Sequence, residues 1–298
     1  MREWVITAAL PFATDALVAY LGRRAVVGVE QFRGHRYQRV LVIDDETVEL
    51  EVDLSHTAVS GVVCVRATCS AGLVDAINER VRWLIDPLWE PAPAARVLET
   101  DPRLEPLVRR RPGLRVPGSM APFEVAVRAI VGQQISVAAA TTLTARISRE
   151  FGHPVSSAFL GLERTFPTPQ ILSSAPLEGC GLPRTRASAI RDLAAAIAAG
   201  RVVLHRPSSD EVVVAVQAIR GIGPWTAQYV ALRGLGGHDC LPVADLGLRT
   251  VLSSVPGTPL SPRELARRSE SWRPYRGVAA VHLWTSILLD ASPATSAT

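Results

Sequence analysis

The sequence contains no lysine: all 32 basic residues among its 298 are arginine. Chemistry that needs a lysine amine, such as a Schiff base or a P-loop, is therefore excluded. The four cysteines lack the paired Cys-x-x-Cys spacing of a zinc site. No uninterrupted apolar run reaches the roughly 18 residues that cross a bilayer. Because no signal-peptide pattern is present, we expect a reducing, cytoplasmic location and no membrane partner.

Acidic and basic residues are unevenly distributed along the chain. Residues 1–88 carry 9 Arg against 12 Asp and Glu, a net charge of −3, whereas residues 89–298 carry 23 against 16, a net charge of +7. A basic C-terminal two-thirds is compatible with a polyanionic partner such as nucleic acid. Hydrophobic residues make up 48% and charged residues 20%, which predicts a folded protein of roughly two domains.

The first 88 residues predict a small antiparallel sheet with one or two helices packed against it. β-branched residues alternate or cluster in three segments that are separated by turns, residues 39–43, 47–54 and 61–68. Apolar side chains recur at helical spacing in two further segments, residues 11–23 and 71–84.

A proline-rich stretch, residues 86–93, predicts a domain boundary. Beyond it the apolar spacing is almost everywhere helical. Residues 123–148 form one long amphipathic run, and five shorter runs follow, residues 186–199, 210–219, 225–232, 246–254 and 262–270. We therefore predict an α+β fold, with a small antiparallel-sheet domain over residues 1–88 and an all-helical region over residues 89–298.

Gly221-Ile222-Gly223 predicts a tight turn between two helices, because the first helix ends near Ile219 and Pro224 can occupy the first position of the second. Glycines let the backbone approach a ligand closely, and the amides that open the second helix favour an anion. A phosphate of duplex DNA would fit this turn. The alternative is an ordinary turn between two helices.

The whole string over residues 219–229, IRGIGPWTAQY, resembles the helix-hairpin-helix element of DNA repair glycosylases. Residues 111–118 (RPGLRVPG), 123–146 and 272–284, together with the N-terminal domain, are similar to bacterial 3-methyladenine DNA glycosylase II (AlkA type). The similar motifs keep their order from about residue 5 to 290. The resemblance implies two helical subdomains with an active-site cleft between them.

Asp245 precedes an apolar-periodic segment, so locally it is typical of a helix N-cap. The resemblance implies a catalytic role, because the family places an Asp shortly after the hairpin at the start of the next helix. Cleavage of an N-glycosidic bond builds positive charge on the sugar, and an ionised carboxylate can stabilise that charge and orient water. Because the chain has no lysine, the resemblance implies a monofunctional, water-using enzyme.

The resemblance also places Trp225, Tyr229 and Trp284 around a base pocket, with Tyr20 at its edge. Aromatic faces suit alkylated purines because N3- or N7-methylation makes the base cationic. The alternative is that these rings fill the hydrophobic core.

DNA contacts follow from the same resemblance. The family opens the duplex with a wedge from a loop that reads GQQIS here (residues 132–136), which puts Gln134 at the wedge position; the alternative is a structural Gln at a helix start. The hairpin residues expected at the DNA are Gly221, Ile222, Gly223 and Thr226. No cofactor is required, but a structural Na⁺ or K⁺ would be held by the backbone carbonyls of Gln217, Ile219 and Ile222.

The sequence thus predicts a monomeric hydrolase that flips alkylated bases out of double-stranded DNA and cleaves their N-glycosidic bonds. These bases are 3-methyladenine and related N-alkylpurines, with O2-alkylpyrimidines as further candidates. Two alternatives remain open at this point. One is a recognition protein that binds alkylated DNA without chemistry, and the other is a glycosylase for different lesions such as uracil or hypoxanthine.

Overall fold

The computed structural model describes residues 1–204 and 208–290. Five strands form one antiparallel sheet in the order β1-β5-β4-β3-β2. They are β1 (Arg2–Thr7), β2 (Glu30–Arg33), β3 (Arg36–Ile43), β4 (Glu46–Asp53) and β5 (Val62–Thr68). The three central strands correspond to the predicted segments. The two edge strands do not appear in the sequence pattern, because β2 is short and polar and both pair along one side only.

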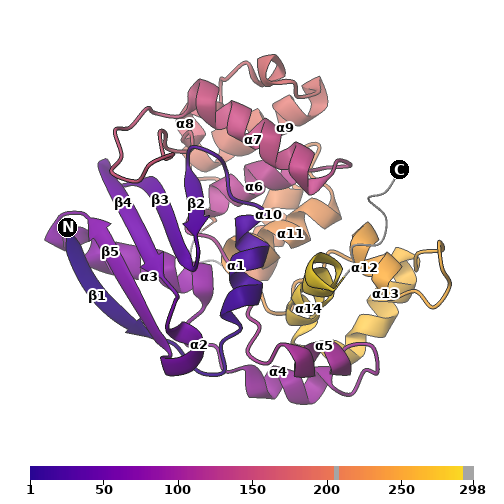
Figure 1. Cartoon of the computed structure of the whole chain (residues 1–298). Helices are drawn as coiled ribbons and strands as arrows, with labels where there is room; N and C mark the ends of the chain where they lie inside the picture. Colours follow the sequence, from indigo (N-terminus) through magenta and orange to yellow (C-terminus); the bar gives the residue numbers. More distant parts are fainter. Residues whose placement is uncertain (205–207, 291–298) are drawn as a thin grey trace, which may run out of the picture.

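Two helices complete the N-terminal core. The helix α3 (Val74–Ile85) packs Ile77, Val81 and Ile85 against the sheet. The helix α1 (Thr14–Gly22) lies between the sheet and the C-terminal helices, as Figure 1 shows. The stretch 55–61, predicted as a turn, contains the four-residue helix α2 (Thr57–Ser60), and η1 (Ala71–Leu73) leads into α3.

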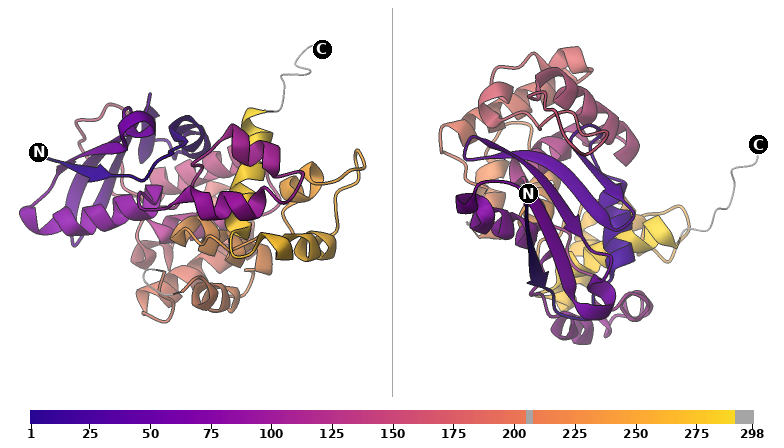
Figure 2. Two further views of the ribbon diagram at one scale, coloured as in Figure 1. Left: turned by 90° about the horizontal axis from the view of Figure 1, so that it is seen from below. Right: turned by 60° about the vertical axis from the view of Figure 1, so that its left-hand side comes forward.

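The rest of the described chain is predominantly helical (Figure 2). Its helices enclose two hydrophobic cores. The first core is built by α6, α9, α10 and α11, and the second by α4, α5, α12, α13 and α14. The bounds are α4 (Pro91–Leu98), α5 (Glu105–Arg110), α6 (Pro122–Val131), α7 (Val137–Phe151), α8 (Pro169–Leu172), η2 (Leu177–Cys180), α9 (Arg184–Ala198), α10 (Ser209–Gln217), α11 (Pro224–Leu235), α12 (Leu246–Val251), α13 (Pro262–Arg268), η3 (Ser269–Trp272) and α14 (Arg276–Leu289). Among the described residues, no helix has the length and apolar character needed to cross a membrane.

The single long helix predicted over residues 123–148 is wrong, because the chain leaves the helix after Val131 and re-enters it at Val137. Gln134 has φ 59°, in the left-handed region that L-residues rarely enter. Ser136 then caps α7, since its hydroxyl accepts a hydrogen bond from the Ala139 N–H at 3.2 Å. Apolar spacing continues across this break, so periodicity alone does not reveal it.

Arg115 joins the two parts of the molecule. Its side chain is 1% exposed and lies over the ring of Phe12, with Cζ 4.0 Å from the ring centroid. Burial lowers the pKa of Arg115 to about 10, so the guanidinium stays charged at neutral pH. It donates hydrogen bonds to five backbone carbonyls, those of Ala9, Pro11, Asp86, Trp89 and Gly113.

His282 on α14 makes stability depend on pH. Its side chain is 3% exposed, and its Nδ1 has no hydrogen-bond partner in the described part of the chain. Burial, and then the charge of Arg111, lower the pKa of His282 from 6.5 to about 3 although the Leu107 carbonyl acts against them. The folded protein therefore keeps this ring neutral at pH values where the unfolded chain protonates it.

We predict that acidification from pH 7 to pH 5 costs about 2 kcal/mol of unfolding free energy through this group, because each pH unit below 6.5 contributes about 1.4 kcal/mol. Urea denaturation at both pH values measures the loss. His282→Gln should lose correspondingly less between the two pH values, and substitution of the exposed His56 by Gln should behave as wild type. Identical pH dependence in wild type and His282→Gln would contradict the prediction.

Candidate active site

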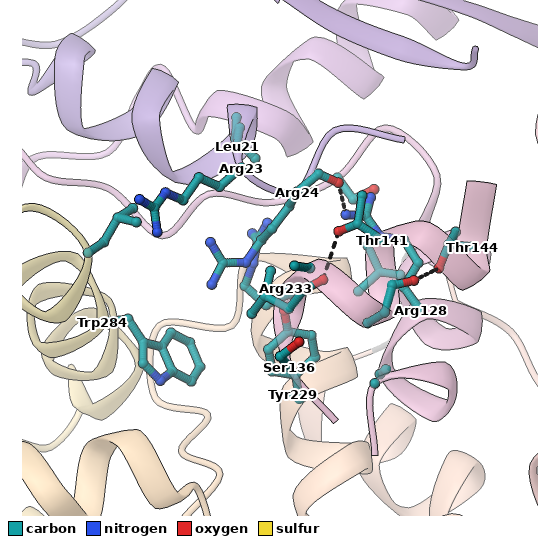
Figure 3. A pocket seen from close by; sticks show the side chains of 18 of the residues that line it. Leu21, Arg23, Arg24, Arg128, Ser136, Thr141, Thr144, Tyr229, Arg233 and Trp284 are labelled. Atoms are coloured by element: carbon teal, nitrogen blue, oxygen red, sulfur yellow. Dashed lines mark hydrogen bonds between the residues drawn. The ribbon is translucent and has the colours of Figure 1, made fainter. Parts of the chain in front are cut away.

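A cavity of about 630 Å³ lies where both helical cores approach the end of α1. Its walls come from α6, α7, α11 and α14, from the loop that carries Asp245, and from residues of the N-terminal part that include Arg23, Arg24, Glu30 and Arg39. Figure 3 shows Arg23, Arg24, Tyr229, Arg233 and Trp284 around it. A cavity of this size is typical of a small-molecule or base-binding site. In the described part of the chain, no group of three or more His, Cys, Asp and Glu side chains could hold a metal ion.

Both oxygens of the Asp245 carboxylate are fixed by hydrogen bonds. Trp225 Nε1 donates to Oδ2 at 3.2 Å, and Trp284 Nε1 donates to Oδ1 at 3.1 Å. The backbone N–H of Leu248 also donates to Oδ1, at 3.0 Å, which makes Asp245 the N-cap of α12. Asp245 therefore caps α12 and lines the cavity at the same time. The bond to the Leu248 N–H anchors the carboxylate, and the two indole N–H groups fix its plane.

Three of the four predicted pocket rings line the cavity. Trp225 and Tyr229 stack with ring centroids 5.2 Å apart and planes 18° from parallel, and the Tyr229 and Trp284 centroids are 5.9 Å apart. Tyr20 differs: it is 1% exposed, does not line the cavity, and lies with its ring centroid 6.4 Å from that of Trp284. Its place is behind the pocket wall, where its hydroxyl has no hydrogen-bond partner among the described residues.

Two arginines of the cavity received no role from the sequence. The Cζ atoms of Arg24 and Arg233 lie 3.8 and 4.9 Å from the Tyr20 ring centroid. In Figure 3 they gather with Tyr229 on one side of the cavity, across from Trp284. Burial alone would raise the pKa of Tyr229, but Arg24, Arg233 and Arg128 outweigh it and lower that pKa. The one signal for Arg233 in the sequence is its position among apolar residues of a helix.

The loop between α6 and α7 is tied to the hairpin. Gln133 Nε2 donates to the Gly221 carbonyl at 3.1 Å and to Thr226 Oγ1 at 3.0 Å. Gln134 is exposed at the turn of this loop, free to reach outward as the predicted wedge. The sequence singled out Gln134 and missed Gln133, whose partners lie about ninety residues away along the chain.

The hairpin connects α10 to α11 as predicted. Gly221 has φ +88°, and Gly223 is the N-cap of α11, with Pro224 at its first position. Both glycines are exposed, whereas the side chains of Ile222 and Thr226 are buried. A contact of these last two residues with DNA would therefore run through their backbone atoms.

Gly221→Val should weaken binding to every duplex alike, because a β-branched residue at positive φ distorts the turn and an added Cβ would lie 3.1 Å from Ala189 Cβ. We expect about a tenfold loss of affinity, since a left-handed L-residue costs about 1–2 kcal/mol. Fluorescence anisotropy with undamaged duplexes of different sequence measures it. Gly200→Val is the control for backbone strain, because Gly200 also has a positive φ but lies after the C-terminal end of α9, outside the hairpin. A loss confined to one sequence would refute a phosphate contact.

The predicted monovalent cation needs open backbone carbonyls at the hairpin. The Ile219 carbonyl already accepts a hydrogen bond from the Ile222 N–H at 3.1 Å. In the described chain, no backbone donor outside the helices reaches the carbonyls of Gln217 and Ile222. The donor set therefore fits a Na⁺ or K⁺ ion, and this site stays a prediction.

The two parts of the chain match two protein-family models: residues 6–121 match the AlkA N-terminal domain, and residues 127–275 match the HhH-GPD superfamily base excision DNA repair protein. The chain is 32% identical to DNA-3-methyladenine glycosylase 2 of Escherichia coli over 289 residues, 92% of this chain and 94% of that protein. It is 33% identical over 280 residues to the probable bifunctional transcriptional activator/DNA repair enzyme AlkA of Mycobacterium tuberculosis.

The mycobacterial match covers 93% of this chain but 55% of the relative, so the chain spans about half the length of that protein. The fold is similar to that of a 3-methyladenine DNA glycosylase from Archaeoglobus fulgidus, with a TM-score of 0.83 and 23% identity over 97% of this chain and 99% of the other.

The chain belongs to the HhH-GPD superfamily of base-excision DNA repair proteins and, within it, to the AlkA-type 3-methyladenine DNA glycosylase II family. This membership confirms the resemblance and the predicted fold class. The individual site residues and the boundary at residue 88 stay predictions.

Proposed function

We propose that this protein excises alkylated bases from duplex DNA by hydrolysing their N-glycosidic bonds. Its substrates are 3-methyladenine and related N-alkylpurines, together with O2-alkylpyrimidines. The observation that carries the proposal is the Asp245 carboxylate, which two indole N–H groups hold at an aromatic cavity large enough for a flipped base. Family membership supports it, because this family repairs DNA by base excision.

The geometry suits a dissociative cleavage. With the base held against the aromatic wall that Trp225, Tyr229 and Trp284 form, the glycosidic bond breaks and its electron pair stays on the base nitrogen. Positive charge then grows on the sugar, and the carboxylate of Asp245 stabilises it while water attacks from the opposite face. Because both carboxylate oxygens are already hydrogen-bonded, the group needs no reorganisation as the charge develops.

The product is an abasic site in an intact strand. Strand cleavage by a related route needs an amine that attacks the sugar, and this chain has no lysine to supply one. Gln134 fills the gap that the flipped nucleotide leaves, and the amides of the hairpin hold a neighbouring phosphate. A Na⁺ or K⁺ ion on the carbonyls of Gln217, Ile219 and Ile222 would add positive charge at that phosphate.

Incubation with methylated duplex DNA tests the proposal, with released bases resolved by chromatography and strand integrity followed on a denaturing gel. We expect free 3-methyladenine and 7-methylguanine, and strands that break only after alkali treatment. Binding of methylated DNA without release of any base would overturn the enzyme assignment in favour of a recognition protein.

A further inference from the structure

The chain satisfies its buried and half-buried arginines in two ways, either with several backbone carbonyls, as at Arg115, or with carboxylates. Arg39 pairs with Glu30 and Glu124, and Arg128 pairs with the same two residues. A buried charge without such a partner is expensive, because its hydration is lost and nothing replaces it. Exceptions in the interior therefore call for an explanation.

Arg233, which is buried, and Arg24, which is half-buried, have neither arrangement, and both line the base cavity. Neither forms an ion pair with any carboxylate in the described part of the chain. Arg233 is 5% exposed; its Nη1 donates to the Gly118 carbonyl at 3.3 Å, and its Nε has no partner. Arg24 Nη1 donates to the Tyr20 carbonyl at 3.0 Å, and its guanidinium also interacts with the Tyr229 side chain. The charge of Asp245 acts on Arg24 without forming an ion pair with it.

The tyrosine between the two guanidiniums does not neutralise them. Burial raises the pKa of Tyr20, with Tyr229 and Asp245 acting in the same direction and Arg24 and Arg233 against it. The phenol therefore stays neutral, and its ring face supplies only a cation–π contact to each arginine. The two positive charges remain available to whatever occupies the cavity.

We propose that Arg24 and Arg233 form a positively charged end of the base pocket, which stabilises the electron pair arriving on the departing base and therefore contributes more to the release of neutral lesions than to the release of cationic ones. The inference rests on the proposed glycosylase function. The pair acts on charge that moves toward it, whereas Asp245 acts on the positive charge left behind on the sugar.

The charge on the departing base decides how strongly the two arginines should affect its release. When the C1′–N bond breaks, the electron pair stays on the base, and water adds its oxygen to C1′ and loses a proton to solvent. A neutral base such as hypoxanthine leaves as an anion that then takes a proton from water, whereas cationic 7-methylguanine leaves neutral. Positive charge in the pocket favours both departures, but it also repels the cationic base when it binds.

Kinetics on two duplexes test this, one with hypoxanthine and one with 7-methylguanine. Both bases carry an oxygen at C6, and they differ in charge and in the 2-amino and N7-methyl groups of 7-methylguanine. Arg24→Gln should lower kcat/KM for hypoxanthine about tenfold or more, the order expected for one lost charge-stabilising donor. For 7-methylguanine kcat/KM should change much less, because a lower kcat is offset by a lower KM. Arg233→Gln should give the same split.

Two further variants keep the test decisive. Arg24→Lys retains the charge and should recover most of the lost hypoxanthine activity. Arg36→Gln, on an exposed arginine of β3 that pairs with Asp53, should leave both substrates unchanged. An equal loss of kcat/KM on both duplexes, no loss with Arg24→Gln, or no recovery with Arg24→Lys would overturn the proposal.

The wild-type enzyme separates failure of this inference from failure of the proposed function. If it releases neither of these bases and no 3-methyladenine from methylated duplex DNA, the glycosylase function itself is refuted. If it releases 7-methylguanine but never hypoxanthine, the glycosylase function stands and the inference is overturned, because Arg24 and Arg233 would then not support the release of a neutral base.

Discussion

Asp245→Asn should lower the rate constant for base release at least about a hundredfold, because a neutral amide cannot stabilise positive charge on the sugar. The substitution also disturbs the site locally. If the amide oxygen keeps the hydrogen bonds from Leu248 and Trp284, the new NH₂ group faces the Trp225 N–H, donor against donor. Affinity for undamaged duplex should stay nearly unchanged, since the hairpin is untouched. Single-turnover release from a labelled duplex measures the rate.

Trp225→Phe separates the two effects of that substitution. It removes the N–H that would oppose the amide but keeps both the carboxylate and an aromatic ring, so it should retain far more activity than Asp245→Asn. Near-wild-type release by Asp245→Asn would remove the carboxylate charge from the mechanism. Equal losses in the two variants would assign the effect to broken geometry alone.

Arg115→Met should lower the free energy of unfolding by at least about 3 kcal/mol, because buried carbonyls left without a donor cost about 1–3 kcal/mol each. Five carbonyls accept from this guanidinium, and two of them, those of Asp86 and Gly113, also accept a backbone N–H, so three lose the donor described for them. Methionine keeps an apolar contact with Phe12, so the loss reports the hydrogen bonds and not a cavity. Urea denaturation followed by circular dichroism measures it.

The matched control is Arg96→Met, which replaces an exposed arginine on α4 and should change stability by no more than about 0.5 kcal/mol. A loss below about 1 kcal/mol for Arg115→Met would show that solvent or neighbouring donors can satisfy the carbonyls.

Short-range patterns predicted much of this molecule. Alternating and helical spacing placed the central strands and most of the larger helices, and Gly-Ile-Gly followed by Pro224 placed the hairpin. Asp245 could be assigned two roles because a helix N-cap and the carboxylate that the resemblance implies occupy the same position, directly before a helix. In the segment RPGLRVPG (residues 111–118), by contrast, short-range patterns predicted nothing, and the segment was informative only as a resemblance. The structure shows why a glycine is needed there: Gly113 has φ +80°, and a Cβ at this position would lie 2.1 Å from the Pro11 carbonyl oxygen.

What the sequence did not reveal depends on contacts between distant segments. Arg24 follows α1 and Arg233 lies on α11, so neither position indicates that both guanidiniums meet at the ring of Tyr20. The break at Gln134 is hidden for a related reason, since the apolar pattern continues through it. Tyr20 was expected at the pocket edge, and only the packing of α1 against α14 places it behind the wall.

The two hydrogen bonds of Gln133 fix a distance between two parts of the molecule. They hold the loop that presents Gln134 at one spacing from the turn at Gly221. If Gln134 enters the base stack and the hairpin holds a phosphate, as proposed, the distance between these two contacts on DNA is fixed. A duplex in which an extra unpaired nucleotide shifts the phosphate relative to the lesion could then make only one of the two contacts at a time. Under that proposal, recognition depends on the position of the lesion along the backbone as well as on the chemistry of the base.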